Sequence, residues 1–329
     1  MNFSTTRRCA LQALAAAVAI GLAPAALAAE DNYPNRPIRM VLGFSAGGGT
    51  DVIARELAQK MSESLGVSVV VDNKPGANGN ISAELVAKAP GDGYTLLYNT
   101  SSIVLSPGIY SKLGYDVLKD LKPVGLVANL PIVLVTSNTV KPKSVTDLVA
   151  VMKREPEKFN YASAGNGNIT HFAMLMFEHA VGVKSNHIPY RGEAPAMADL
   201  MGGQVDLYMG TAPGVMPAIN DKRVRALAVT SLKRLPALPE VPTLSESVAK
   251  GLEIGAWSGI MAPPGTPDAV IARLNDSLKK ALASPEVQAR FASQSAETRY
   301  ATAEQYGQFL RTELPRWRQI AQQANVKLD

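Results

Sequence analysis

The sequence predicts an α/β protein with two doubly wound domains joined by two crossings of the chain. Three observations support this prediction. Short apolar segments typical of buried strands alternate with segments of helical periodicity from residue 38 onward. A long apolar segment, residues 124–135, interrupts the alternation, which then begins again. A second apolar segment, residues 224–230, precedes a helical C-terminal part, so both ends of the chain are expected to build the first domain.

The first alternating set has the order strand, helix, strand, helix, strand. Its first helix carries Ile53, Leu57 and Met61 at helical spacing. The expected elements are a strand at 38–42, a loop at 43–49, a helix at 51–64, a strand at 67–71, a helix at 81–89, a turn at 90–93 and a strand at 94–98. This order is typical of a mostly parallel sheet.

The second set follows the segment at 124–135, which is broken at Asn129-Leu130-Pro131 as expected of a connection between domains. The expected elements are helices at 145–154, 169–180, 194–201 and 215–221, strands at 159–162, 187–190 and 205–209, and C-terminal helices at 268–283 and 303–324. We assign residues 29–128 and 229–329 to domain 1 and residues 129–228 to domain 2, with the ligand cleft between them.

Residues 1–28 are predicted to be a cleaved signal peptide. Arg7 and Arg8 precede an apolar stretch, and Ala26-Leu27-Ala28 is the small-residue pattern at which signal peptidase cuts. The adjacent arginines leave the route open between general secretion and twin-arginine export. We therefore expect an exported protein.

Composition excludes several classes of function. Cys9 is the only cysteine and lies in the predicted signal peptide, so we expect no disulfide and no cysteine-bound metal in the mature chain. The net charge of +5 becomes +3 without Arg7 and Arg8, because residues 1–28 hold no acidic residue. No run of basic residues suggests nucleic-acid binding, and no later segment has about twenty apolar residues.

Two glycine-rich loops each follow a predicted strand and open a helix. They are Gly43–Asp51 and Ala162–Asn168, and neither contains Lys or Arg. Glycine lets the backbone approach a ligand, and a helix N-terminus offers N–H groups to an anion. We expect Gly48 and Gly167 to need either close approach or a positive φ. Asp51 and Asn168 are also plausible helix caps, and the charge of Asp51 would compete with an anionic ligand.

Five segments resemble receptors of the tripartite tricarboxylate transporter family of the Bug type. They are Tyr33-Pro34-x-Arg36-Pro37-Ile38, Gly43-Phe44-x-Ala46-Gly47-Gly48-x-x-Asp51, Val69-Val70-Val71-Asp72-Asn73-Lys74-Pro75-Gly76-Ala77-x-Gly79, Asp92-Gly93-Tyr94-Thr95-Leu96-Leu97 and Tyr190-x-Gly192-x-x-Pro195-Ala196-x-x-Asp199-Leu200-x-x-Gly203-x-Val205-Asp206. The matches follow in order over nearly the whole mature chain.

The resemblance implies a periplasmic receptor with the type II periplasmic-binding-protein fold, which holds a small carboxylate between the two loops and passes it to membrane permease subunits. It implies neither an enzyme nor a cofactor, and we expect a monomer without nucleic-acid partners. It assigns ligand binding to Phe44, Ser45, Ala46, Gly47, Gly48, Gly49, Thr50, Asp51, Ser163, Ala164, Gly165, Asn166, Gly167, Asn168 and Thr170.

Other residues are candidates from their positions alone. Hydroxyl contacts are expected from Thr100, Ser101 and Ser102, which follow the third strand. Tyr190, Thr211 and Trp257 are candidates either for the pocket wall or for the core. The ligand itself stays open among dicarboxylates, tricarboxylates, acidic amino acids, aromatic acids and amides.

The alternative function is a secreted serine hydrolase. Gly43-Phe44-Ser45-Ala46-Gly47 fits the G-x-S-x-G pattern between a strand and a helix. Against it, the three histidines His171, His179 and His187 all lie mid-chain, and no earlier strand supplies an oxyanion loop. The first loop also lacks the Lys-Ser/Thr of a P-loop, and His171 and His179 are about 12 Å apart along one helix, too far for a shared metal.

Overall fold

The computed structural model describes residues 33–323, and its main folded unit begins at Arg36. The predicted signal peptide and Cys9 lie outside the described residues. Within the described range, no helix combines the length and the apolar character that a membrane span requires.

Strands from both ends of the chain form a mixed sheet with the order β2-β1-β3-β9-β4, which we call the first sheet. Its strands are β1 (Ile38–Leu42), β2 (Val69–Asn73), β3 (Thr95–Thr100), β4 (Lys122–Ser137) and β9 (Gly255–Ala262), with the short β10 (Glu297–Thr298) beside β4. β1 is parallel to β2 and β3, whereas β9 is antiparallel to both β3 and β4. The parallel part of the sheet agrees with the sequence prediction.

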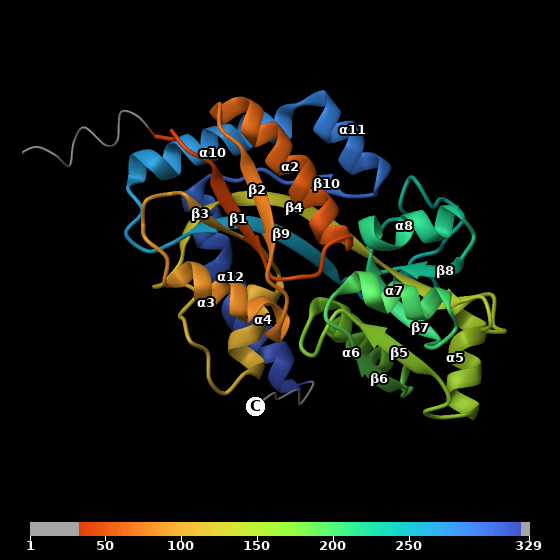
Figure 1. Cartoon of the computed structure of the whole chain (residues 1–329). Helices are drawn as coiled ribbons and strands as arrows, with labels where there is room; N and C mark the ends of the chain where they lie inside the picture. The colour runs from red at the N-terminus through yellow and green to blue at the C-terminus, as the bar shows by residue number, and fades with distance from the viewer. Residues whose placement is uncertain (1–32, 324–329) are drawn as a thin grey trace, which may run out of the picture. The chain divides into compact units, whose positions relative to one another are not determined.

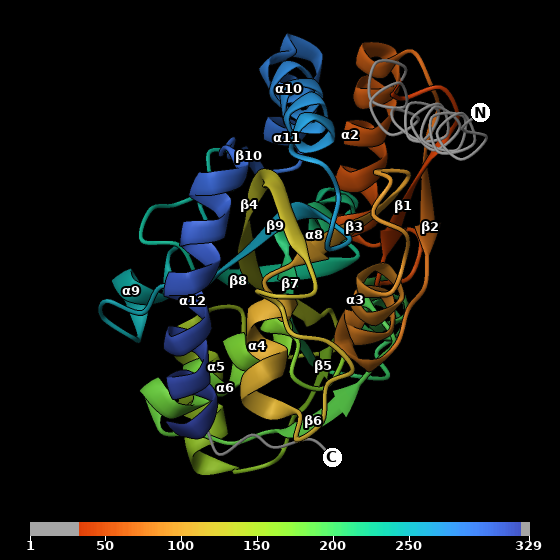
Figure 2. The same ribbon diagram turned by 90° about the vertical axis from the view of Figure 1, so that its left-hand side faces the viewer.

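Helices cover both faces of this sheet (Figure 1). One face carries α2 (Gly49–Leu65), α10 (Asp268–Ala283) and α11 (Pro285–Ser293). The other face carries α3 (Asn80–Ala87), α4 (Ser102–Ile109) and α12 (Ala303–Gln323), and η1 (Ala77–Gly79) contacts α3 and α4. Figure 2 shows α12 running alongside α4, so the C-terminal helix packs on an element from the N-terminal half.

The second alternating set forms the order β4-β7-β5-β6, with β8 on the other side of β4. Its strands are β5 (Asn160–Ser163), β6 (Asn186–Pro189), β7 (Leu207–Thr211) and β8 (Val224–Val229). Its helices are α5 (Val145–Arg154), α6 (Ile169–Val181), α7 (Glu193–Met201), α8 (Ala212–Asn220) and α9 (Leu244–Ser247). β5 is parallel to β6 and β7, so the predicted α/β class is confirmed.

Local sequence explains where the long helices begin and end. In α2 the periodic residues Ile53, Leu57 and Met61 are fully buried, and Gly66 ends the helix in the left-handed conformation at φ 73°. In α6 the side chain of Asn168 caps the first turn by accepting from the N–H of Thr170 at 3.0 Å. Each helix therefore begins directly at a glycine-rich loop.

The segment expected to cross between domains is one continuous strand of 16 residues, β4, which Asn129-Leu130-Pro131 does not break. Pro131 pairs with Gly255 of β9, and the next residue, Ile132, pairs with Thr211 of β7. The proline thus lies where one ladder ends and the next begins, which is a position that tolerates a missing N–H.

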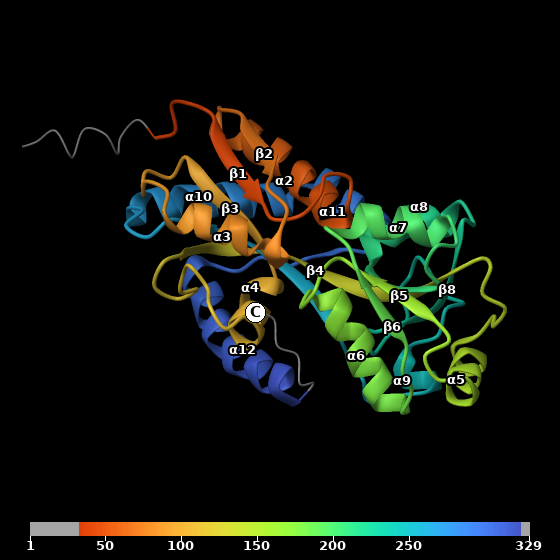
Figure 3. The same cartoon turned by 60° about the horizontal axis from the view of Figure 1, so that its bottom comes forward.

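The return of the chain also differs from the prediction. β8 pairs with Val133–Ser137 of β4, and its last residue, Val229, also bridges to Thr243, so β8 does not cross back to the first sheet. Leu235 and Leu238 then pack in the same buried cluster as Val133, and Figure 3 shows α9 beside α5. The strand that rejoins the first sheet is β9, which the sequence reasoning missed, and the short β10 joins it later beside β4.

Candidate functional site

The carboxyl ends of the parallel strands converge on one cavity, which we call the central cavity. β1 leads into the first glycine loop, β5 into the second, and β3 and β7 end at Thr100 and Thr211. Such strand ends are where open α/β sheets bind ligands. The volume is about 30 Å³, which is room for about two water molecules. A larger solute would therefore require the two loops to move apart.

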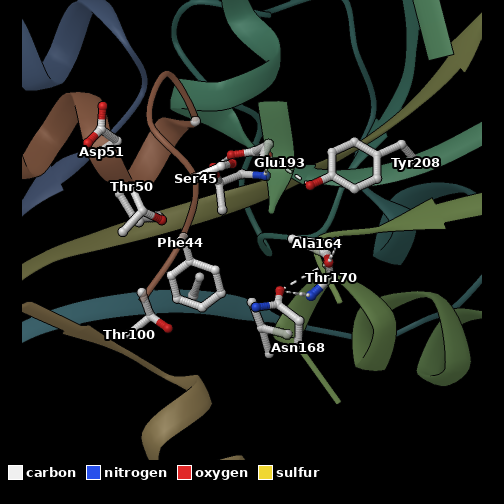
Figure 4. Close-up of a pocket in the computed structure, with 15 residues that line it drawn as sticks. Phe44, Ser45, Thr50, Asp51, Thr100, Ala164, Asn168, Thr170, Glu193 and Tyr208 are labelled. Carbon is white, nitrogen blue, oxygen red and sulfur yellow. Dashed lines mark hydrogen bonds between the residues drawn. The ribbon is translucent and has the colours of Figure 1, made fainter. Parts of the chain in front are cut away.

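Ten of the predicted site residues line the central cavity together (Figure 4). They are Phe44, Ser45, Gly48, Thr50, Asp51, Thr100, Ala164, Asn168, Thr170 and Thr211. Leu130, Ile169, Glu193, Tyr208 and Ala256 complete the lining. The structure thus brings both glycine loops to one place, with hydroxyl groups as the commonest polar side chains.

A second, outer cavity of about 240 Å³ shares Phe44 and Ala164 with the central one. Of the predicted residues, Gly165, Asn166 and Tyr190 line it, together with Arg191. Neither cavity is lined by Ala46, Gly47, Gly49, Ser101, Ser102, Ser163 or Gly167. Trp257 is buried and packs edge-on against Tyr306 and Phe309, so its position is in the core.

In the first loop, the protein's own carboxylates take the backbone N–H groups. The N–H of Gly47 donates to Asp51 at 2.9 Å, and that of Gly49 donates to Glu193 at 3.1 Å. Asp51 also accepts from Arg55 at 2.9 Å and from Asn73 at 2.8 Å. Burial raises the pKa of Asp51, but the hydrogen bonds from Arg55, Gly47 and Asn73 together hold that pKa below its usual value. Asp51 therefore stabilises the loop.

The second loop is likewise tied internally. The N–H of Ala164 donates to Thr170 Oγ1 at 2.9 Å, and the N–H of Gly167 donates to His171 Nδ1 at 3.1 Å. Asn168, besides capping α6, donates to Asn78 at 3.1 Å and to Ser102 at 3.1 Å. Much of the predicted backbone donor set is therefore already used, and the cavity surface offers mainly side-chain hydroxyls and the Asn168 amide.

Two buried histidines, His171 and His187, form hydrogen bonds with residues of the second loop. The rings of His171 and His187 stack at 3.9 Å, and His187 Nε2 lies 2.6 Å from the hydroxyl of Ser163. Burial lowers the pKa of His171 to about 3, with a further contribution from His187, and burial lowers the pKa of His187 to about 4. Both rings are therefore neutral near pH 7.

Glu193 is the cavity residue that sequence reasoning missed. It lies at the first position of α7 and is 7% exposed. Its carboxylate accepts from Gly49, from the N–H and hydroxyl of Thr211, and from Tyr208. Burial raises its pKa against the lowering effect of these donors. In the sequence, a glutamate at the start of a helix is explained by its favourable interaction with the helix dipole. No local pattern therefore predicts that Glu193 lies in the cavity.

The hydrolase alternative finds no support in this geometry. The Ser45 hydroxyl is buried and has no hydrogen-bond partner among residues 33–323. The two inner histidines contact Ser163 and Gly167, and His179 is exposed. The only serine hydroxyl bonded to a histidine in the described part of the chain is that of Ser163, which is fully buried and so closed to a substrate.

Residues 53–326 match the family described as the tripartite tricarboxylate transporter family receptor. The chain belongs to this family. Such receptors bind solutes and are periplasmic, and the protein is therefore a solute-binding receptor. The resemblance expected from the five sequence segments is confirmed.

Solved structures of similar receptors confirm the type II periplasmic-binding-protein fold. The periplasmic binding protein BugD is 39% identical, with a TM-score of 0.87 over 90% of this chain and 99% of that one. Rpa4515 of R. palustris, solved with adipate, is 33% identical, with a TM-score of 0.87 over 90% and 99%. MatC of Rhodopseudomonas palustris, solved with malate, is 30% identical, with a TM-score of 0.83 over 88% and 99%.

Proposed function

We propose that this receptor captures a small carboxylate-bearing solute in the central cavity and delivers it to the membrane subunits of a tripartite tricarboxylate transporter. The observation that carries the proposal is a hydroxyl-lined cavity between two glycine loops. Solved receptors of the same family hold adipate and malate. The proposal includes export through the signal peptide at residues 1–28, a monomeric state and the absence of catalytic turnover.

The proposal assigns the ligand contacts chiefly to side chains. Ser45, Thr50 and Thr100 reach the cavity from the first half of the chain, and Asn168 and Thr170 reach it from the second. Hydroxyl and amide groups donate to a carboxylate without a permanent counter-charge, and a hydrogen bond to a charged group contributes about 1.5–3 kcal/mol. A ligand held in this way binds both loops and draws them together.

Ser45 gives the sharpest test, because its buried hydroxyl has no partner among the described residues. Buried polar groups without partners are rare and are expected where a ligand or water completes the bond. Ser45→Ala should weaken carboxylate binding about tenfold or more by calorimetry, with the melting temperature of the free protein unchanged or raised.

Ser106→Ala is the matched control. Its hydroxyl is also buried and unpartnered within the described range, but Ser106 lies in α4 and lines neither cavity. Binding should be unaffected in this variant. The proposal fails if no small carboxylate binds, or if both variants bind like the wild type. An esterase rate that disappears in Ser45→Ala would instead favour the hydrolase.

A further inference from the structure

A carboxylate of the protein itself occupies the corner of the central cavity where three helices begin. α2 begins at Gly49, α7 begins at Glu193, and α8 follows Thr211. The N–H of Gly49 donates to Glu193 Oε2 at 3.1 Å, and the N–H of Thr211 donates to Oε1 at 2.8 Å. Helix N-termini favour anions, so this corner is an anion site that Glu193 already fills.

The carboxylate is held firmly in that corner. Thr211 Oγ1 donates to Oε2 at 2.8 Å, and the Tyr208 hydroxyl donates to Oε1 at 3.2 Å (Figure 4). A Cβ at Gly214 would lie 2.1 Å from Oε2, and one at Gly49 would lie 2.9 Å from it. Both glycines therefore permit the close approach. Because four donor groups hold the Glu193 carboxylate, we expect it to stay in the cavity when a ligand binds.

Glu193 has no cationic partner in the cavity, and because each of its two oxygens accepts from a backbone N–H, these donors favour the ionised form at the pH of the test below. Among the residues that line the cavity there is no Lys, Arg or His, and the acids are Asp51 and Glu193. Asp51 is paired with Arg55 at 2.9 Å, whereas the donors to Glu193 are all neutral. In a buried site, a second anionic group close to Glu193 is repelled far more strongly than in water.

We propose that Glu193 selects the ligand by charge, so that the receptor takes a small molecule with one carboxylate and with a neutral or cationic hydrogen-bond donor, an amide or an ammonium group, at its other end. The ligand's carboxylate then binds on the side of Thr100 and Asn168, away from Glu193. This inference rests on the proposed function and narrows its ligand class, because a second carboxylate would face Glu193.

Matched probes test the inference by calorimetry at pH 8. The probes are succinate and glutarate, their monoamides succinamate and glutaramate, and the amino acids 4-aminobutanoate and 5-aminopentanoate. The wild type should bind the better monoamide or amino acid at least about tenfold more tightly than the dicarboxylate of the same length. In Glu193→Gln that ratio should fall below about threefold, chiefly through tighter binding of the dicarboxylate.

Glu178→Gln is the matched control, because Glu178 is also a buried carboxylate, 8% exposed, but lines neither cavity. It should keep the wild-type ratio. Should Glu193→Gln not fold, Glu193→Ala replaces it. The wild-type preference for the monoamide or amino acid over the dicarboxylate is a test that needs no variant. A wild type that prefers dicarboxylates, or a Glu193 variant with the wild-type ratio, overturns this inference alone. Failure of every carboxylate to bind overturns the proposed function and this inference with it.

Discussion

Neighbouring glycines of the first loop have different structural requirements. Gly48 has an ordinary extended backbone at φ −78°, and an added Cβ would meet nothing closer than 3.4 Å. At Gly49 an added Cβ would lie 2.5 Å from the N of Gly214 and 2.6 Å from Thr211 Oγ1. Gly48 therefore does not need a positive φ, and its close approach to a ligand stays a prediction. The expectation of a positive φ is confirmed for Gly167, whose φ is 71°.

This difference predicts opposite outcomes for two alanine substitutions. Gly49→Ala should lower the free energy of unfolding by about 1–3 kcal/mol, because backbone atoms must move to admit the methyl group. Gly48→Ala should change it by less than about 1 kcal/mol, because its Cβ has room. Urea denaturation of both variants measures the effect. Equal stability of Gly49→Ala and the wild type would contradict the packing seen around α2 and α8.

At the scale of elements, the stacked histidines join α6 to β6. His171 lies on α6 and also accepts from Gly167, while His187 lies on β6 and contacts Ser163. Tyr161 of β5 stacks on His187 at 4.8 Å. The second glycine loop is thus supported by the packed rings of Tyr161, His187 and His171. Its shape therefore depends on both imidazoles staying neutral.

The depressed pKa values predict a loss of stability in acid. The unfolded histidines take up protons below about pH 6.5, but the folded ones do so only near pH 4 and pH 3. The free energy of unfolding should therefore fall between pH 8 and pH 5 by up to about 2 kcal/mol for each histidine. Denaturant titrations at several pH values measure this slope.

Two histidine variants separate this effect from other titrations. In His187→Gln the free energy of unfolding should fall less between pH 8 and pH 5, by the contribution of one histidine. His179→Gln is the control, because His179 lies exposed on α6, the helix that also holds His171. A slope that is the same in all three proteins would rule out the buried pair as its source.

At the scale of the whole folded unit, hydrogen bonds join the two halves across the cavities. Asn78 of η1 donates to the carbonyl of Gly167 at 2.8 Å and accepts from Asn168 at 3.1 Å. The N–H of Gly49 in the first loop likewise donates to Glu193 of α7, in the other half. Because the central cavity is small, we propose that the two Asn78 contacts break and reform as the ligand passes, with bending where β4 changes partners at Pro131 and Ile132.

Small-angle scattering tests this closure. Addition of a tightly bound carboxylate should reduce the radius of gyration of the wild type. Asn78→Gly should need roughly tenfold more ligand for the same change, because it removes two hydrogen bonds and keeps the left-handed backbone of Asn78 at φ 56°. Asn138→Ala, which removes a bond to Lys222 outside the cleft, is the control. Identical scattering with and without ligand would contradict closure.

The two-domain division of the chain stays a prediction, with one adjustment. Leu235, Leu238 and Val241 pack in the buried cluster of the second sheet, so we place the proposed return to domain 1 at Gly255 rather than at residue 229. β9 was missed because its glycines, Gly255 and Gly259, interrupt the apolar pattern. The close contact of Gly259 with Tyr306 is a tertiary feature that local pattern does not contain.

The sequence by itself determined the alternation of strands and helices, the two glycine loops that each open a helix, and the family. These follow from periodicity and from short motifs, because apolar burial and tight turns act over a few neighbouring residues. Tertiary structure alone decided that Asp51 accepts a hydrogen bond from Asn73 of β2, and that Glu193 lies in the cavity. Gly49 and Glu193 are 144 residues apart in sequence. A hydrogen bond over that separation depends on how strands and helices pack, and no local pattern encodes it.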